Sequence, residues 1–403
     1  MAETYGISVE DYGAVGDGKT DDSPAIQAAL DSGAPRVVLP YGTYRLHRGL
    51  RIHSDTDFIL HPLATLRLAD GAGQSQDDFL LTNADHHGGN RAVRIEGGIW
   101  DGNNPGNPRG PDTPGSYSGV MINFTNVTGL TLRAARLLDA ESYFVRLGKV
   151  ADFLIEDIAF EIRNLRPNQD GVHVSGHCSD GIIRRLSGQG SRTPNDDLVA
   201  LLADDALHRA QNLNGAFNGP IRRIRAEQLR ARSCHSFIRL LSVDHPIEDI
   251  EINDVVGGCR CCAVNMDACR DCRVKLFAEE ARPDGVGTIT NVSISDMSVF
   301  KASDTSRQPL IDFRTHADKF RMERFERDTD RDVSPMTPTL SIEKSGHLDL
   351  RLEGVTDVAH GEDSASLASA TGGPSFLIER GLTPKDTFTL QSGGFERLKV
   401  DKR

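Results

Sequence analysis

The sequence predicts an all-β solenoid, because short strand-like runs recur along it and helical periodicity is scarce after residue 35. Several consecutive runs lie about 23 to 29 residues apart. That is the period of a solenoid coil of three strands, whereas strands of a sandwich recur every roughly 8–12 residues. The runs alternate apolar with polar side chains, so one face of each would be buried inside the coil. They include Val93–Ile95, Leu130–Leu132, Phe153–Ile155, Gly181–Ile183, Ile221–Ile224, Ile247–Ile252 and Val292–Ile294.

A short amphipathic helix is expected near the N-terminus. Asp22 or Ser23 would cap it and Pro24 would begin it, which suits the fixed backbone angle of proline. A strand and a tight turn follow over residues 37–44. Because the open end of a solenoid needs a cover, we expect this helix to close the first coil.

Three segments are predicted along the chain. Residues 1–50 would form the N-terminal cap and first coil, residues 51–360 the solenoid, and residues 361–403 a C-terminal cap or tail. The charge-mixed stretch Arg321–Asp328 is interpreted as a solvated loop or small helix.

Composition narrows the range of partners. The 403 residues carry a formal net charge of −12, which disfavours nucleic acid as a partner. No apolar run approaches the roughly 18 residues that cross a bilayer, so no membrane partner is predicted. Residues 1–6 lack a basic and an apolar leader region, which favours a cytoplasmic protein, or a secreted one if a leader has been removed.

Five of the seven cysteines crowd between Cys259 and Cys272. The C-x-x-C spacing within this cluster suits a zinc site made of Cys261, Cys262, Cys269 and Cys272. The alternative is that these thiols pack as small hydrophobic side chains. We favour packing of the thiols as small hydrophobic side chains, so neither a metal nor any other cofactor is predicted. A zinc site remains the alternative.

Three motifs then point to a family. Residues 11–22 read D-Y-G-A-x-G-D-G-x-x-D-D, residues 37–44 read V-x-L-P-x-G-x-Y, and residues 97–103 read G-G-I-W-D-G-N. Over roughly residues 7 to 300, the sequence resembles the pectate-lyase superfamily and its polygalacturonase-like members, glycoside hydrolase family 28. The resemblance implies a single-stranded right-handed parallel β-helix with a short N-terminal capping helix.

Two further motifs gather carboxylates on neighbouring coils. Residues 168–172, N-Q-D-G-V, are similar to the polygalacturonase motif N-T-D-G-[IV], and residues 195–201, N-D-D-L-V-A-L, to G-D-D-C-[IV]-A-[IL]. Coils stack about 4.8 Å apart. Asp170, Asp196 and Asp197 would therefore share one patch, where like charges raise the pKa of one acid. The alternative is that these residues merely form turns.

The resemblance implies roles for these acids. Asp196 would protonate the leaving oxygen, and Asp170 and Asp197 would activate the attacking water, as in an inverting glycosidase. The family also has a histidine and an R-I-K strand, for which His235 and Arg239 are the candidates. Leu241 stands where that lysine would be, which disfavours galacturonan and favours a neutral sugar or a modified uronide.

His173 is a further candidate for substrate binding, because it alternates with two valines and should face outward beside Asp170. A solvated histidine explains its position equally well. Three classes of function stay open: a glycoside hydrolase, a polysaccharide lyase or epimerase, and a non-catalytic carbohydrate-binding solenoid. The paired acids favour the hydrolase. The expected partner is a carbohydrate, and assembly into a homo-oligomer, such as a trimer, stays open.

Overall fold

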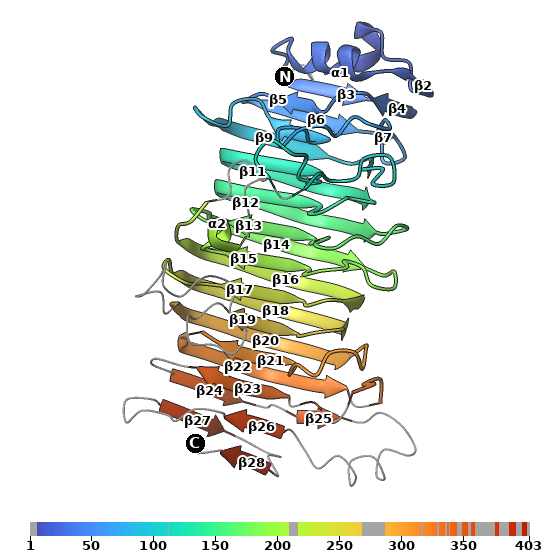
Figure 1. Ribbon diagram of the computed structural model, residues 1–403. Coiled ribbons are helices and arrows are strands. Elements are labelled where there is room, and N and C mark those ends of the chain that lie inside the picture. The colour runs from blue at the N-terminus through green and yellow to red at the C-terminus, as the bar shows by residue number, and fades with distance from the viewer. Residues whose placement is uncertain are drawn as a thin grey trace.

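The chain folds into a column of stacked coils (Figure 1). The computed structural model describes residues 6–111, 113–208, 217–267, 287–315, 317–328, 330–334, 337, 339–344, 349–353, 356–358, 375–378, 387–391 and 397–400. Pairings between the named strands are parallel, and each strand pairs with the equivalent strand of the next coil. The predicted all-β parallel solenoid is confirmed.

Each coil has three faces, and short strands build the first of them. In chain order these are β5 (Leu50–Ile52), β8 (Leu81–Asn83), β13 (Val172–Ser175), β15 (Val199–Leu202), β17 (Ile238–Leu241), β19 (Val264–Asp267), β21 (Ile311–Arg314), β23 (Leu340–Lys344), β26 (Ser375–Ile378) and β28 (Arg397–Val400).

Long strands turn through more than one face of the coil. β11 (Ile122–Leu138) and β12 (Val145–Glu161) turn through all three faces. The other two faces continue in β14 (Ser179–Gly188), β16 (Ile221–Cys234), β18 (Ile247–Cys259), β20 (Ile289–Lys301) and β22 (Ala317–Asp328).

Shorter strands complete these two faces near the ends of the column. The N-terminal ones are β1 (Ile7–Ser8), β2 (Asp17–Asp21), β3 (Arg36–Leu39), β4 (Thr43–Leu46), β6 (Thr56–Leu60), β7 (Thr65–Leu68), β9 (Asn90–Glu96) and β10 (Ile99–Asp101). The C-terminal ones are β24 (Asp349–Glu353), β25 (Thr356–Val358) and β27 (Thr387–Gln391).

Single residues with left-handed backbone angles bend the long strands from one face to the next. In β12 these are Lys149, Asp152 and Asp157, with φ of 55°, 54° and 56°. Arg185 and Gln228 stand at the position of Asp157 on the next two coils, with φ of 53° and 57°. Short polar side chains such as aspartate tolerate this conformation better than most. The bends let one strand cover two or all three faces without a loop.

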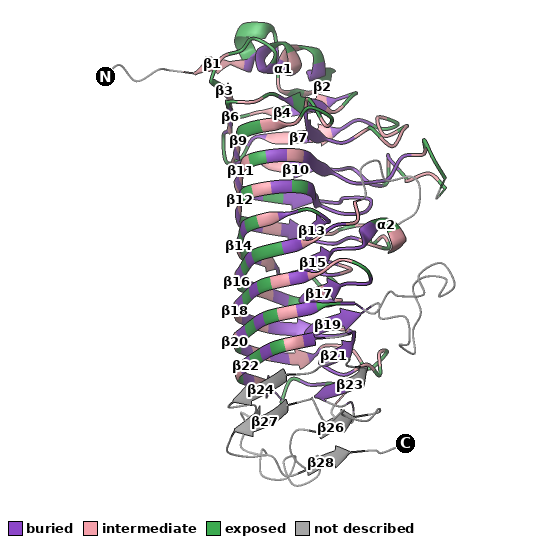
Figure 2. Ribbon diagram, turned by 90° about the vertical axis from the view of Figure 1, so that its left-hand side faces the viewer, coloured by how far each residue is buried: buried purple, intermediate pink, exposed green. Residues whose placement is uncertain are grey.

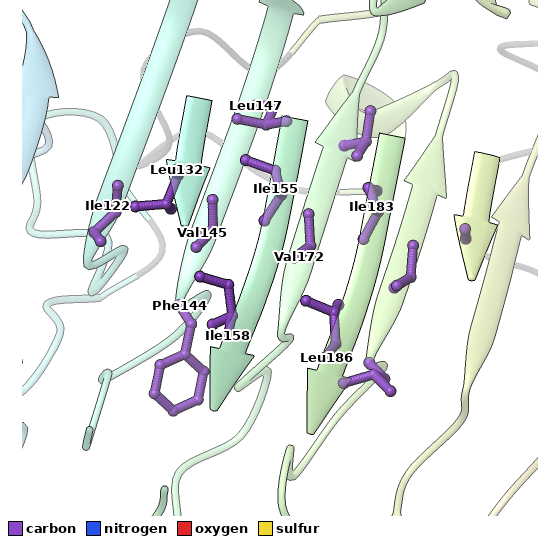
Figure 3. Close-up of a cluster of buried hydrophobic side chains, with 14 of the residues drawn as sticks. Ile122, Leu132, Phe144, Val145, Leu147, Ile155, Ile158, Val172, Ile183 and Leu186 are labelled. Atoms are coloured by element: carbon purple, nitrogen blue, oxygen red, sulfur yellow. The ribbon is translucent and has the colours of Figure 1, made fainter. Parts of the chain in front are cut away.

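The core is a set of apolar rows that run along the column axis. Ile155 of β12 stacks on Ile183 of β14, and Ile158 stacks on Leu186, and all four side chains are buried (Figure 3). Figure 2 shows the matching alternation of buried and exposed residues along the strands. Burial of each such side chain stabilises the fold by about 1.5–3 kcal/mol.

The expected capping helix covers the N-terminal end as α1 (Ser23–Leu30), with a 3-10 helix, η1 (Val9–Tyr12), beside it (Figure 1). It begins at Ser23 rather than at Pro24, and the side chain of Asp22 does not cap it. Instead, the Asp22 carboxylate accepts hydrogen bonds from the amides of Val15 at 2.7 Å and Gly16 at 3.3 Å. Asp22 thus fixes the preceding loop against the helix.

The interpretation of Arg321–Asp328 as a loop or small helix is wrong, because these residues belong to strand β22. The predicted segment limits at residues 50 and 360 stay predictions, and much of residues 361–403 lies outside the described part of the chain. Among the described residues, no helix is long and apolar enough to cross a membrane.

Candidate active site

A ladder of equivalent turns precedes the first-face strands and carries the predicted acids. The amide of Asp196 donates to the carbonyl of Gln169 at 3.2 Å, and that of His235 to the carbonyl of Asp196 at 3.1 Å. One position further on, the amide of Gly171 donates to the carbonyl of Asp197 at 2.8 Å. Backbone stacking therefore places Asp170, Asp197 and His235 on three neighbouring coils of one edge.

His235 lies between the two adjacent aspartates. Its Nδ1 is 3.3 Å from Asp196 Oδ1 and 3.5 Å from Asp197 Oδ1. Arg239 approaches from β17, with NH1 at 4.0 Å from Asp197 Oδ2 and NH2 at 3.1 Å from Asp267 Oδ2. Contacts thus link four of the six predicted site residues, Asp196, Asp197, His235 and Arg239, and Asp170 lies on the coil before Asp197.

The accessibility of these side chains differs sharply. Asp196 exposes 23% of its side chain and His235 exposes 38%, while Asp197 exposes 3%. Asp170 is also buried. A bound molecule would therefore meet Asp196 and His235 first, with Asp170 and Asp197 beneath them.

The two adjacent aspartates titrate in opposite directions. Burial, followed by the negative charges of Asp197 and Asp170, raises the pKa of Asp196 to about 7. Burial also opposes ionisation of Asp197, but a hydrogen bond from His235 and the charges of Arg239 and His235 outweigh it and lower the pKa of Asp197. At neutral pH, Asp196 can therefore hold a proton beside an ionised Asp197.

His173 is buried, contrary to the expectation of an outward-facing, substrate-contacting side chain. It points away from the core, but its Nδ1 lies 2.7 Å from Asp170 Oδ2 and its Nε2 lies 3.1 Å from Asp205 Oδ1. The ring of Tyr143 stacks on it at 3.8 Å between centroids. With both nitrogens occupied by carboxylates, His173 orients Asp170 rather than reaching a sugar.

Asp205 is a site residue that the sequence did not reveal. It begins α2 (Asp205–His208), which lies beside β13 and β15 (Figure 2). Its carboxylate is fully buried, contacts His173 and lies 3.9 Å from Arg146 NH2. Burial opposes its ionisation, but the charges of His173 and Arg146 lower the pKa of Asp205. It stands three residues after the end of β15, and no motif marked it.

The donors at the site also bear on metal binding. Atoms of Asp196, Asp197 and His235 that could bind a cation lie within 4.8 Å of one another. However, Asp197 and Cys261 raise the pKa of His235 to about 11 against the effect of burial, so its ring carries a proton at neutral pH. A cation bound here by His235 would have to displace that proton. Of the alternative zinc set, Cys269 and Cys272 lie outside the described residues.

Comparison with known proteins agrees with this architecture. Residues 6–99 match the family model described as rhamnogalacturonase A/epimerase, pectate lyase-like. The fold is that of the pectate-lyase-like right-handed β-helices. The preneck appendage protein of Bacillus phage PZA is 36% identical over 104 residues, which are 25% of this chain. The match spans only 12% of the phage protein.

Two solved structures extend the likeness over most of the β-helix. PfbA, a surface adhesin of Streptococcus pneumoniae, gives a TM-score of 0.60 at 13% identity and covers 88% of this chain and 89% of its own. The family 28 exopolygalacturonase of Yersinia enterocolitica gives a TM-score of 0.52 at 14% identity, covering 89% of this chain and 76% of its own. An adhesin and a hydrolase share the fold, so function must be argued from the site.

Proposed function

We propose that the protein is a glycoside hydrolase that cleaves a poly- or oligosaccharide with the carboxyl groups of Asp170, Asp196 and Asp197. The observation that carries the proposal is that the pKa values of two adjacent carboxyls are shifted in opposite directions. Asp196 is accessible and has a pKa raised to about 7, while Asp197 is buried and has a lowered pKa. Pairs of acids whose surroundings separate their pKa values supply the acid and the base of such reactions.

In the proposed reaction, Asp196 gives its proton to the glycosidic oxygen as the bond to the leaving sugar breaks. Asp197, whose pKa is lowered, and Asp170 activate the attacking water, which gives up one proton to this pair. His235, which is protonated, stabilises the negative charge that remains on Asp196 after the transfer. His173 and Asp205 hold Asp170 in place.

The substrate is proposed to be a neutral sugar or a modified uronide rather than galacturonan. Arg239 already pairs with Asp267 at 3.1 Å, and its side chain is only 15% exposed. Leu241 supplies no second positive charge at the place where the related hydrolases are expected to have a lysine. A pair of cations for a free carboxylate is therefore missing from this strand.

The test compares the wild type with Asp196→Asn on a panel of plant and microbial oligosaccharides. New reducing ends and ultraviolet absorbance are recorded together. We expect reducing ends without absorbance, and a loss of about 10²–10⁴-fold in kcat/KM in the variant. Asp180→Asn, an exposed aspartate paired with Arg223 away from the site, is the matched control and should keep full activity.

The opposite results are equally definite. Absorbing, unsaturated products that survive Asp196→Asn would contradict hydrolysis and indicate a lyase. A changed sugar without bond cleavage would indicate an epimerase, an activity that the family description also names. For a hydrolase, the anomer of the first product, read by NMR, decides between inversion and retention.

A second candidate function is carbohydrate binding without turnover. The likeness to the adhesin PfbA and to a phage appendage protein favours it. In that case, calorimetry would detect binding of an oligosaccharide that neither the wild type nor Asp196→Asn cleaves.

A further inference from the structure

Two cysteines continue the turn ladder beyond the acids. The amide of Cys261 donates to the carbonyl of His235 at 2.8 Å, and the amide of Phe237 donates to the carbonyl of Cys262 at 3.3 Å. Cys261 and Cys262 therefore stand where Asp196 and Asp197 stand two coils earlier. This places a pair of thiols directly against the histidine that contacts both acids.

The two thiols contact each other. Cys261 Sγ lies 3.6 Å from Cys262 Sγ, and both sulfurs lie beside Oε1 of Gln308, that of Cys262 at 3.5 Å. The ammonium of Lys301, which is buried, donates to the carbonyl of Cys261 and, at 2.9 Å, to that of Gln308. Lys301 thus fixes the backbone around the pair and brings a positive charge to it.

The surroundings divide the roles of the two sulfurs. A hydrogen bond from Cys262, followed by His235, lowers the pKa of Cys261 to about 4 despite burial. The same contact with Cys261, together with burial, raises the pKa of Cys262. Thiolates are the reactive form of cysteine. By contrast, burial raises the pKa of both Cys178 and Cys259 to about 12.

We propose that Cys261 and Cys262 form an oxidation site that takes hydrogen peroxide and closes a disulfide between the two adjacent residues. Accessibility favours a small oxidant, since Cys261 is 5% exposed and Cys262 is 0% exposed. A vicinal disulfide closes a small strained ring, and strained disulfides are readily reduced. The modification is therefore reversible by ordinary thiols.

The reaction proceeds in two steps. The Cys261 thiolate attacks one peroxide oxygen: an S–O bond forms, the O–O bond breaks, and the released hydroxide takes a proton from solvent to become water. The Cys262 thiol then attacks the sulfenic sulfur: an S–S bond forms, the S–O bond breaks, and the hydroxyl leaves as water with the proton of that thiol. The two sulfurs lose two electrons in total, and the peroxide is reduced to two waters.

The oxidation also changes the charge beside the proposed acid. A disulfide removes the thiolate that helps to hold the proton on His235, so we infer that the pKa of His235 falls on oxidation. The thiol chemistry itself goes beyond the proposed function and needs no sugar. Its readouts therefore stand even if hydrolysis is not observed.

The test uses the full chain, reduced and then treated with one equivalent of hydrogen peroxide near neutral pH. Peptide mapping by mass spectrometry of the wild type should find a Cys261–Cys262 disulfide that dithiothreitol reverses. Cys262→Ser should stop the reaction at sulfenic acid on Cys261, which dimedone traps. Cys261→Ser should slow thiol loss by about tenfold, and Cys178→Ser should leave it unchanged.

Two outcomes would overturn the proposal. One is oxidation of Cys178, Cys234 or Cys259 at the same rate as Cys261. The other is a disulfide that joins Cys261 to Cys269 or Cys272 instead of to Cys262. Because the first readout is made on the wild type, it does not depend on whether a variant folds.

Discussion

The surroundings shift the pKa values of Asp196 and Asp197 in opposite directions, and the effect of this arrangement on the stability of the fold depends on pH. The pKa of Asp196 is raised to about 7 by burial and by the charges of Asp197 and Asp170. In the unfolded chain it returns to about 3.9. At pH values between these two, Asp196 holds a proton in the folded protein but not in the unfolded chain. The free energy of unfolding therefore falls as pH rises through this window.

Asp196→Asn is therefore expected to stabilise the fold while it removes activity. The amide cannot ionise, so the gain is absent near about pH 4 and reaches on the order of 1–3 kcal/mol near about pH 8. Urea unfolding at the two pH values measures it. Asp180→Asn should show no such gain, because a salt bridge with Arg223 lowers the pKa of Asp180 to about 2. An equal gain in both variants would contradict the explanation.

His173 has the opposite dependence on pH. Burial lowers its pKa, but the charge of Asp205 and hydrogen bonds to Asp170 and Asp205 outweigh this and raise the pKa. Its ion pairs therefore stabilise the fold fully below the unfolded value of about 6.5, and this contribution is lost as pH rises through the folded pKa.

His173→Gln should cost about 3–5 kcal/mol at acidic pH, because two buried carboxylates lose their common cation. The cost should shrink at alkaline pH, and kcat should fall as Asp170 loses its orientation. His177→Gln is the control, since His177 is exposed and contacts neither acid. A cost independent of pH would show that His173 is neutral in the folded protein.

Sequence motifs could place Asp170, Asp196 and Asp197, because both motifs precede first-face strands one coil apart. They could not place Asp205 or Cys261. Which residues meet across neighbouring coils depends on the length of the chain between them, and the segment between β15 and β17 exceeds one ordinary coil. The contact of His173 with Asp205 depends on how the chain turns after β15, which no motif predicts.

At the level of the strands, a bulge in β16 positions His235 of the candidate site. β16 and β18 pair in register up to Ala231 and Gly257 and again at Cys234 and Cys259, so β16 carries one extra residue between these points. His235 follows the bulge directly. Gly257 has φ of 132°, and a Cβ atom there would lie 1.9 Å from the carbonyl oxygen of Ala231.

Gly257→Ala should therefore cost about 2–4 kcal/mol, through backbone strain and steric overlap. It should also lower kcat by displacing His235. Gly33→Ala is the matched control, because Gly33 has φ of 77° but no atom within 4 Å of the added Cβ. Its cost should be about 1 kcal/mol. Equal midpoints of urea unfolding for the two variants would contradict this role of Gly257.

The wrong interpretation of Arg321–Asp328 has a related cause. Lys319 and Arg324 adopt left-handed angles, with φ of 52° and 54°, and Arg324 bends β22 within that stretch. After it, the buried positions change parity, from Phe320 and Met322 to Phe325. A search for strict alternation misses such a strand because the buried positions change parity within it. The bend itself carries no glycine or proline that would mark it in the sequence.

Along the whole column, each coil contacts mainly the coils before and after it. Stability in such a solenoid is close to a sum of coil energies and nearest-neighbour contacts, so damage should spread only a short distance. Phe320 is buried in β22 near the C-terminal end, with its ring 4.9 Å from that of Phe313. Phe58 is buried in β6 near the N-terminal end, 6.2 Å from Trp100.

Phe320→Ala and Phe58→Ala form a reciprocal pair for testing this. Each should cost about 3–5 kcal/mol locally. Hydrogen exchange should accelerate in β20 and β22 for Phe320→Ala, and in β3, β6 and β9 for Phe58→Ala, with the opposite end unchanged. The coils of the candidate site lie between the two ends, so both variants should keep the proposed activity at low temperature. Uniform acceleration along the column in either variant would instead show that all coils unfold as one cooperative unit. A destabilising change at either end would then destabilise the candidate site as well.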